Sequence, residues 1–249
     1  NPASAGGGGG TTTFSFTTGE TTVTSAEIIV FNDVNIFDNT GMDSSFTDSS
    51  ANPNNKRLLQ NLIGFTGTGS RASAKVVQFD CGRSSGFSSA CDFATMKAEI
   101  VAAGLKVTRV DSSSGSITSI PSDVKVLFLW LPKVAFTGVE VNTLKQFAAD
   151  GGRIVFVGEF PGFYGTTNIN GVANPLLADL GAKSRIKTGL SFDSGFTKVG
   201  ASSINTASGH QITVGLTGIE HAAAAEMTVD SGDTVLWSDN TTGTHPVAA

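Results

Sequence analysis

The sequence predicts an α/β fold in which a doubly wound, mostly parallel sheet spans residues 26–184. Short apolar segments typical of buried strands alternate along this region with amphipathic segments typical of helices. Such an order produces parallel βαβ units with right-handed crossovers. Residues 1–25 predict an extended N-terminal arm, and residues 185–249 predict β-hairpin additions packed on the same domain.

The first half of this domain contains two predicted strands, each followed by a helix. A strand over residues 26–31 (AEIIVF) leads into an Asp- and Asn-rich loop over 32–53. The next segment, 54–64, has its leucines and isoleucine on one helical face. A second strand over 75–79 is followed by a helix for which Asp92 is the expected N-cap.

The second half begins with a strand over residues 106–110 and a loop without helical periodicity. The segment 124–131 is almost wholly apolar, as expected for a central strand covered on both faces. Thr137, with Glu140 three residues later, predicts a capping box at the start of the next helix. The last predicted elements of this domain are a strand over 153–157 and a short helix that begins at Asn174-Pro175.

The two ends of the chain differ from this pattern. Beyond residue 185, short Thr/Val segments at 211–214 and 234–237 predict hairpins that extend the sheet or cover one end of it. Before it, a glycine run over 6–10 precedes a Thr-rich segment with the alternation of a strand. We expect this arm to add to the sheet edge of a neighbouring copy. The expected contact residues of the arm are Thr13, Phe14, Phe16 and Val23.

The composition predicts an exported protein. Only 15% of residues are charged, against roughly 25% in typical soluble domains, which favours an extracellular or cell-surface location and self-association. The chain begins with Asn1 rather than Met, which we interpret as a processed, mature end. The net charge of −5 without a basic cluster excludes a nucleic-acid partner, and no apolar segment is long enough to span a membrane.

Two further sequence features agree with export. Cys81 and Cys91 are spaced for a small disulfide-closed loop, the alternative being two free thiols. Asn240-Thr241-Thr242 is an N-glycosylation sequon, and the Thr-rich runs could carry O-glycans.

Three strings in the second half of the domain resemble a known superfamily. They are VKVLFLWLP (124–132), FTGVEVNTLKQFAADGGRIVFVGE (136–159) and NPLLADLGA (174–182). Together they resemble the class I glutamine-amidotransferase-like (GATase-like) superfamily, a flavodoxin-like α/β group, and most closely its non-catalytic secreted and cell-surface branch. The resemblance covers about three fifths of the chain and implies the fold more strongly than a function.

The same resemblance implies that the chain is not an enzyme. In the enzymes of that superfamily, the elbow after the strand equivalent to 153–157 carries a nucleophilic cysteine between glycines. Here the elbow reads Gly158-Glu159-Phe160-Pro161-Gly162, and it contains no thiol. We therefore predict no catalytic residues.

The candidate ligand-binding residues lie where predicted strands end, since open α/β sheets bind ligands there. They are Asp33, Asp38, Asp80 and Glu159. The Asp-rich loop over 32–53 could hold Ca²⁺, although its spacing matches no EF-hand and a solvated loop explains it as well. No other cofactor is predicted, and the three histidines, His210, His221 and His245, are interpreted as ordinary polar residues.

The function that these features predict is structural. We expect a non-catalytic extracellular protein whose partners are copies of itself, assembled into filaments or a surface layer through the arm and the sheet edges. The alternative is an extracellular module that binds a small ligand or a carbohydrate at the carboxyl ends of the strands. A hydrolase with an atypical site ranks third.

Overall fold

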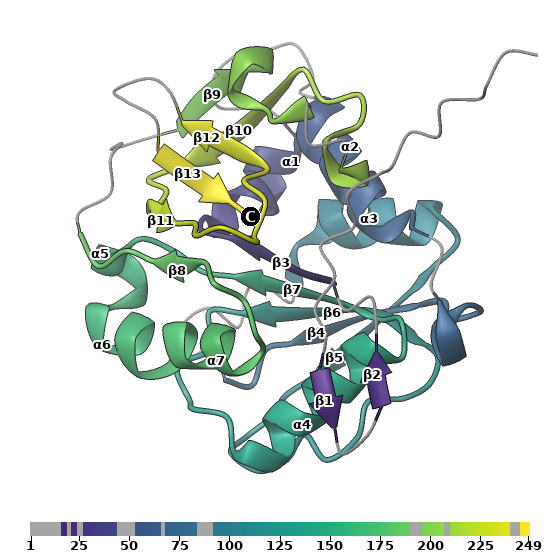
Figure 1. Cartoon of the computed structure of the whole chain (residues 1–249). Coiled ribbons are helices and arrows are strands. Elements are labelled where there is room, and N and C mark those ends of the chain that lie inside the picture. Colours follow the sequence, from purple (N-terminus) through teal and green to yellow (C-terminus); the bar gives the residue numbers. More distant parts are fainter. Residues whose placement is uncertain are drawn as a thin grey trace, which may run out of the picture.

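A computed structural model describes residues 16–18, 21–23, 27–43, 53–65, 68–83, 92–189, 196–206, 210–239 and 245–249. At its centre is a seven-stranded sheet in the order β12-β13-β3-β7-β6-β4-β5 (Figure 1). Its parallel strands are β3 (Glu27–Phe31), β4 (Val76–Asp80), β5 (Lys106–Val110), β6 (Val124–Trp130) and β7 (Arg153–Val157). The antiparallel strands β12 (Trp237–Asp239) and β13 (His245–Ala248) extend it beyond β3. The predicted α/β class with a mostly parallel sheet is confirmed.

The central strands form because both of their faces are covered by apolar side chains. Every residue of β7 and every residue of β6 except Lys125 is buried. β-Branched and aromatic residues dominate these strands, as expected for a parallel sheet buried on both sides. Leu236, Trp237 and Val247 belong to the same buried cluster as β3, so the C-terminal region shares the core of the sheet.

Helices lie on both sides of the sheet. In Figure 1, α1 to α3 lie above it, whereas α4, α6 and α7 lie below it. Their bounds are α1 (Asn39–Asp43), α2 (Pro53–Ile63), α3 (Ala94–Ala102), α4 (Gly138–Ala149), α5 (Pro161–Tyr164), α6 (Thr166–Asn168) and α7 (Asn174–Asp179). A π-helical segment, η4 (Ile169–Ala173), joins α6 to α7. None of the described helices is both long and apolar enough to cross a membrane.

The strand order differs from the predicted flavodoxin-like order. In that order the strands follow 2-1-3-4-5 across the sheet. Here β5, β4, β6 and β7 take the first four places, and β3, which precedes them in the chain, takes the fifth. The doubly wound, GATase-like detail of the prediction is therefore not confirmed.

The C-terminal region forms hairpins, although not where the sequence predicted them. β9 (Phe196–Gly200) pairs with β10 (Gly218–Ala222), and β8 (Arg185–Ile186) pairs with β11 (Met227–Thr228). Among the short 3-10 turns, which are η1 (Val34–Ile36), η2 (Gly69–Arg71), η5 (Ala201–Ser203) and η7 (Gln211–Thr213), the last replaces the strand expected at 211–214.

The arm residues that the structure describes pair with each other. β1 (Phe16–Thr18) and β2 (Thr21–Val23) form a short antiparallel hairpin in which Phe16 lies opposite Val23. Thr13 and Phe14 lie outside the described residues.

Candidate functional site

The first place to look for a site is between the carboxyl ends of β4 and β6. The chain leaves β4 toward α3 and leaves β6 toward α4, which lies on the opposite side of the sheet (Figure 1). Open α/β sheets bind ligands at such a divergence. Asp80, one of the predicted ligand residues, ends β4 at this point, and it is buried. Ser112 donates to its carboxylate from the backbone N (3.2 Å) and from Oγ (2.5 Å), and burial nevertheless raises the pKa of Asp80.

Arg83 occupies this divergence. Its side chain is 1% exposed. Nε donates to Ser112 Oγ (2.9 Å), and Nη1 donates to the carbonyl oxygens of Val134 (3.2 Å) and Ala135 (2.8 Å). Nη2 donates to the carbonyl oxygen of Ser113 (2.5 Å) and to Glu140. A guanidinium with five donors is thus satisfied by the protein itself.

Glu140 completes the cluster from the first turn of α4. Its Oε1 accepts from Arg83 and from the backbone N of Ile117 (3.1 Å), and its Oε2 accepts from the backbone N of Thr137 (2.8 Å). Burial alone would raise the pKa of Glu140, but these hydrogen bonds outweigh burial and hold the pKa below its ordinary value. The capping-box glutamate therefore also neutralises Arg83.

Backbone packing closes the same place. A Cβ atom on Gly82 would lie 2.3 Å from the carbonyl carbon of Asp111, so only glycine allows the loop after β4 to approach the loop after β5 this closely. The position that a ligand would take in this class of sheet is filled by protein atoms.

A second divergence, between β3 and β7, is also filled. Glu159 follows β7 and is 2% exposed; its oxygens accept from the backbone N of Val34 (3.1 Å) and of Phe160 (2.9 Å). Asp33 follows β3 and is fully buried; it accepts from the backbone N of Asn35 (2.7 Å) and of Ala222. Both predicted ligand residues instead hold turns in place.

Asp38, the remaining predicted ligand residue, lies at the start of α1. It accepts from the backbone N of Gly41 (2.6 Å) and from Asn35 Nδ2 (2.9 Å), and burial raises its pKa. Across the part of the chain that the structure describes, no group of three or more His, Cys, Asp or Glu side chains is placed to hold a metal ion. Residues 44–50 of the predicted Ca²⁺ loop lie outside that part, so the Ca²⁺ site stays a prediction.

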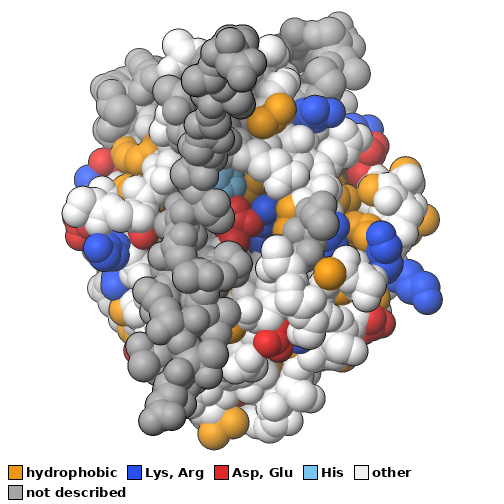
Figure 2. Space-filling view, turned by 45° about the vertical axis from the view of Figure 1, so that its right-hand side comes forward, with side chains coloured by type: hydrophobic (Ala, Val, Ile, Leu, Met, Phe, Trp, Pro, Cys, Tyr) orange, Lys and Arg blue, Asp and Glu red, His pale blue; other side chains and the backbone are white. Residues whose placement is uncertain are grey.

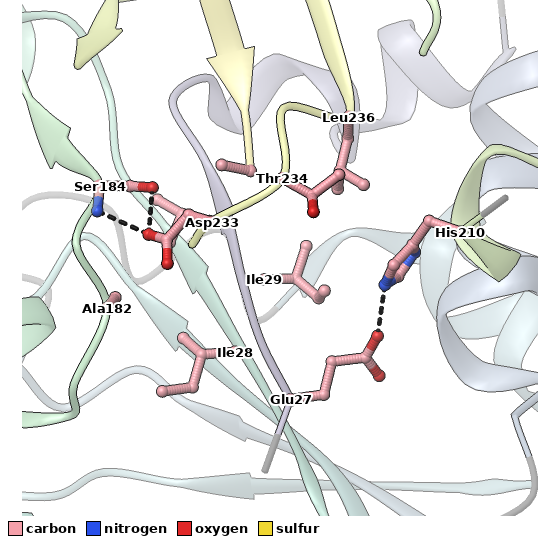
Figure 3. A pocket seen from close by; sticks show the side chains of 11 residues that line it. Glu27, Ile28, Ile29, Ala182, Ser184, His210, Asp233, Thr234 and Leu236 are labelled. Atoms are coloured by element: carbon pink, nitrogen blue, oxygen red, sulfur yellow. Dashed lines mark hydrogen bonds and ion pairs between the residues drawn. The ribbon is translucent and has the colours of Figure 1, made fainter. Parts of the chain in front are cut away.

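A pocket opens beside β3, away from these two divergences. It measures at most about 410 Å³, counting the solvent at its mouth. Ile28 and Ile29 line its apolar side, and Figure 3 shows two polar walls facing each other across them. One wall is formed by Ser184 and Asp233, and the other by Glu27 and His210. The sequence did not single out Glu27 or Asp233, because they lie 206 residues apart and neither belongs to a motif.

Glu27 and His210 form a pair in which no described bonding position is left over. His210 Nε2 lies 2.7 Å from Glu27 Oε1, and His210 Nδ1 accepts from the backbone N of Ile212 (3.3 Å). Glu27 Oε2 accepts from Arg153 Nε (2.5 Å). Burial alone would raise the pKa of Glu27, but the hydrogen bond from His210 and the charge of Arg153 hold it below its ordinary value. In Figure 2, a histidine lies beside acidic and basic side chains near the middle of the face.

The opposite wall has unused bonding capacity. Asp233 Oδ2 accepts from the backbone N of Lys183 (2.8 Å) and of Ser184 (2.7 Å) and from Ser184 Oγ (2.5 Å). Its Oδ1 accepts no hydrogen bond from any described residue, and the hydroxyl of Thr234, which also lines the pocket, has no described partner. A ligand could use both oxygens.

The cysteine prediction falls partly outside the described residues. Cys81 is buried, and no described cysteine is free. Cys91 and the sequon residue Asn240 both lie outside, so the Cys81–Cys91 disulfide and the glycan at Asn240 are not tested by the structure.

Comparisons with known proteins found little. No protein-family model and no curated protein matches the chain. Among solved structures, the mmIFT52 N-terminal domain matches with a TM-score of 0.45 and 12% sequence identity, covering 69% of this chain and 77% of that one.

This finding corrects several predictions. The matched structure is an intraflagellar transport protein domain and not a GATase-like protein, so the predicted membership in that superfamily is wrong. The predictions of an extracellular structural protein, of a cell-surface location and of partnership with its own copies are wrong on the same finding.

The sheet edges give a physical reason against assembly through them. At one edge, β5 exposes Lys106 and Arg109, and charged side chains on an edge strand oppose pairing with another sheet. At the other edge, Ile204 forms a bridge with Trp237 of β12, which covers part of its backbone. Neither edge is the long, flat, apolar strand that self-assembly by strand addition requires.

Proposed function

We propose that this chain is a non-catalytic binding domain for a small molecule, with the pocket beside β3 as its site. The observation that carries the proposal is the pair of unused oxygens, Asp233 Oδ1 and Thr234 Oγ1, above an apolar surface formed by Ile28 and Ile29. Ligand sites combine apolar lining with a small number of polar groups that orient the ligand. This site differs from the carboxyl ends of the strands, which the sequence suggested.

The proposal of a non-catalytic role rests on how the charged groups are used. A general base needs an unshared lone pair within reach of a substrate proton. His210 has both ring nitrogens in hydrogen bonds, Glu27 has both oxygens occupied, and Glu159 of the elbow accepts from two backbone amides. These groups support the structure and leave binding to the opposite wall of the pocket.

The test is to fill the pocket from a position that tolerates a larger side chain. Thr234 is half-buried, so Thr234→Phe should occupy the pocket without disturbing the core. Thr118→Phe, at an exposed position outside the pocket lining, is the matched control. Saturation-transfer NMR with a mixture of short alkyl amines, alcohols and carboxylates should show contact with wild type and with Thr118→Phe, and not with Thr234→Phe. Equal signals from all three proteins, or none from wild type, would reject the pocket as the site.

A further inference from the structure

We infer that the pocket beside β3 selects a small primary amine: a cationic head on a short apolar body. This inference rests on the proposed function and adds the class of ligand. It follows from the charges of the two walls, the kind of bonding groups left free, and the lining between them.

The charges of the two walls are not balanced in the same way. Glu27 is paired with Arg153, whose side chain is 2% exposed, so the charge of that wall is neutralised from within the protein. Asp233 forms no ion pair with any described residue; its three hydrogen bonds come from backbone amides and a hydroxyl. An uncompensated negative charge therefore remains on the Asp233 wall and attracts a cation.

The free groups suit an ammonium ion in particular. A primary ammonium has three donors and no acceptor. Asp233 Oδ1 and Thr234 Oγ1 can both accept, and Figure 3 shows the Thr234 oxygen directed into the space between the two walls. A carboxylate ligand would lie between Asp233 and Glu27 and would be repelled by both.

The lining limits the rest of the ligand. Ile28, Ile29 and Leu236 present apolar side chains next to the acceptors, so a short alkyl body is buried while the head bonds to Asp233. With at most about 410 Å³ of space, only a small molecule fits. A ligand of so few atoms is expected to bind with a Kd on the order of millimolar.

The experiment uses three probes of nearly equal shape: n-butylammonium, 1-butanol and butyrate. Each is titrated into the ¹⁵N-labelled chain, and Kd is obtained from shifts of the backbone amides of Ile28, Ile29, Ser184 and Thr234. We expect n-butylammonium to bind roughly tenfold more tightly than the other two, which corresponds to one favourable charge interaction of about 1.4 kcal/mol.

Asp233→Asn is the discriminating variant. Its amide oxygen can still accept from Lys183 and Ser184, while its NH₂ group replaces the free oxygen in the pocket. We expect this variant to lose the preference for the amine, whereas Asp179→Asn, an exposed control, keeps it.

The outcomes separate the two proposals. If 1-butanol or butyrate shifts the pocket amides at concentrations as low as n-butylammonium does, the pocket binds small molecules but the amine class is wrong. If Asp233→Asn keeps the full preference, the amine class is wrong as well. If none of the probes shifts those amides, the proposed function fails and the inference fails with it.

Discussion

Arg83 illustrates how one side chain can remove a binding site. Its guanidinium lies between the ends of β4 and β6 and bonds to Ser112, Glu140 and three backbone carbonyls. The cation of Arg83 also lies 4.2 Å from the ring centroid of Phe136, which shields it from solvent. Because the donors and their acceptors are matched, the buried charge is tolerated where a ligand would otherwise bind.

Arg83→Met tests this interpretation. Removing one partner of a buried ion pair leaves the other charge unpaired, and we expect the free energy of unfolding to fall by about 3–5 kcal/mol. Urea denaturation followed by circular dichroism measures the change. Arg109→Met is the control, because Arg109 pairs with Asp111 at the surface and should change stability little. Similar losses in both variants would mean that the Arg83 cluster is not special.

Glu27 gives a pH-dependent prediction. Its pKa in the folded chain lies below the ordinary value of 4.5, so its stabilising contribution is complete above 4.5 and is lost as pH falls through the folded-state pKa. At neutral pH, Glu27→Gln leaves buried Arg153 without its partner, and we expect a loss of about 2 kcal/mol. The difference from wild type should shrink toward zero in acid.

Glu226→Gln is the matched control for this prediction. The side chains of Glu226 and Glu27 are both 26% exposed, but Lys187, the partner of Glu226, is 42% exposed, whereas Arg153 is 2% exposed. Urea denaturation from neutral pH downward compares the variants. A loss in Glu27→Gln that does not change with pH would contradict the assigned ion pair.

At this scale the sequence located the predicted residues but not their roles. Asp33, Asp80 and Glu159 do lie at strand ends, as predicted, yet they accept from nearby backbone amides or from Ser112. Whether such a carboxylate is free depends on which loop reaches it. Ala222, for example, donates to Asp33 across 189 residues of sequence, and no local pattern encodes that contact.

Among the secondary-structure elements, α4 was predictable because its start signal is local. Thr137 and Glu140 form the predicted capping box: the side chain of Thr137 accepts from the backbone N of Glu140 (3.4 Å), and Glu140 accepts from the backbone N of Thr137 (2.8 Å). The helix after β4 was less accurate. Its N-cap is Phe93, without a side-chain hydrogen bond, and not Asp92.

Thr137→Val tests the value of the cap. Valine keeps the shape of threonine but cannot accept a hydrogen bond, and we expect a loss of about 1 kcal/mol in the free energy of unfolding. Thr137→Ser should retain most of the stability, because serine can still accept from the backbone N of Glu140. If both variants lost stability equally, packing of the methyl group rather than capping would be the cause.

The segment at 211–214 shows why short elements are harder to predict. Its alternation of polar and apolar residues is typical of a strand, yet it forms the 3-10 turn η7. His210 determines this outcome by accepting from the backbone N of Ile212, while Asn61 donates to the carbonyl oxygens of Ile212 and Val214. Tertiary hydrogen bonds override a weak local preference.

For the molecule as a whole, the alternation of strands and helices predicted the α/β class, but it could not predict the strand order. Placing β3 beside β7 joins residues that lie 126 positions apart, such as Glu27 and Arg153. The pocket depends on the same arrangement, since its two polar walls come from opposite ends of the chain and meet only across β3. A site assembled in this way has no sequence motif.

The most direct measurement is a map of where a small amine binds on the whole molecule. Backbone amide shifts on addition of n-butylammonium to the ¹⁵N-labelled chain should concentrate at Ile28, Ile29, Ser184 and Thr234. The amides of Asp80, Ser112, Gly158 and Glu159, at the carboxyl ends of the strands, should remain unchanged because their surroundings are already filled. Shifts at that second set without shifts at the first would contradict the claim that this fold binds its ligand beside β3.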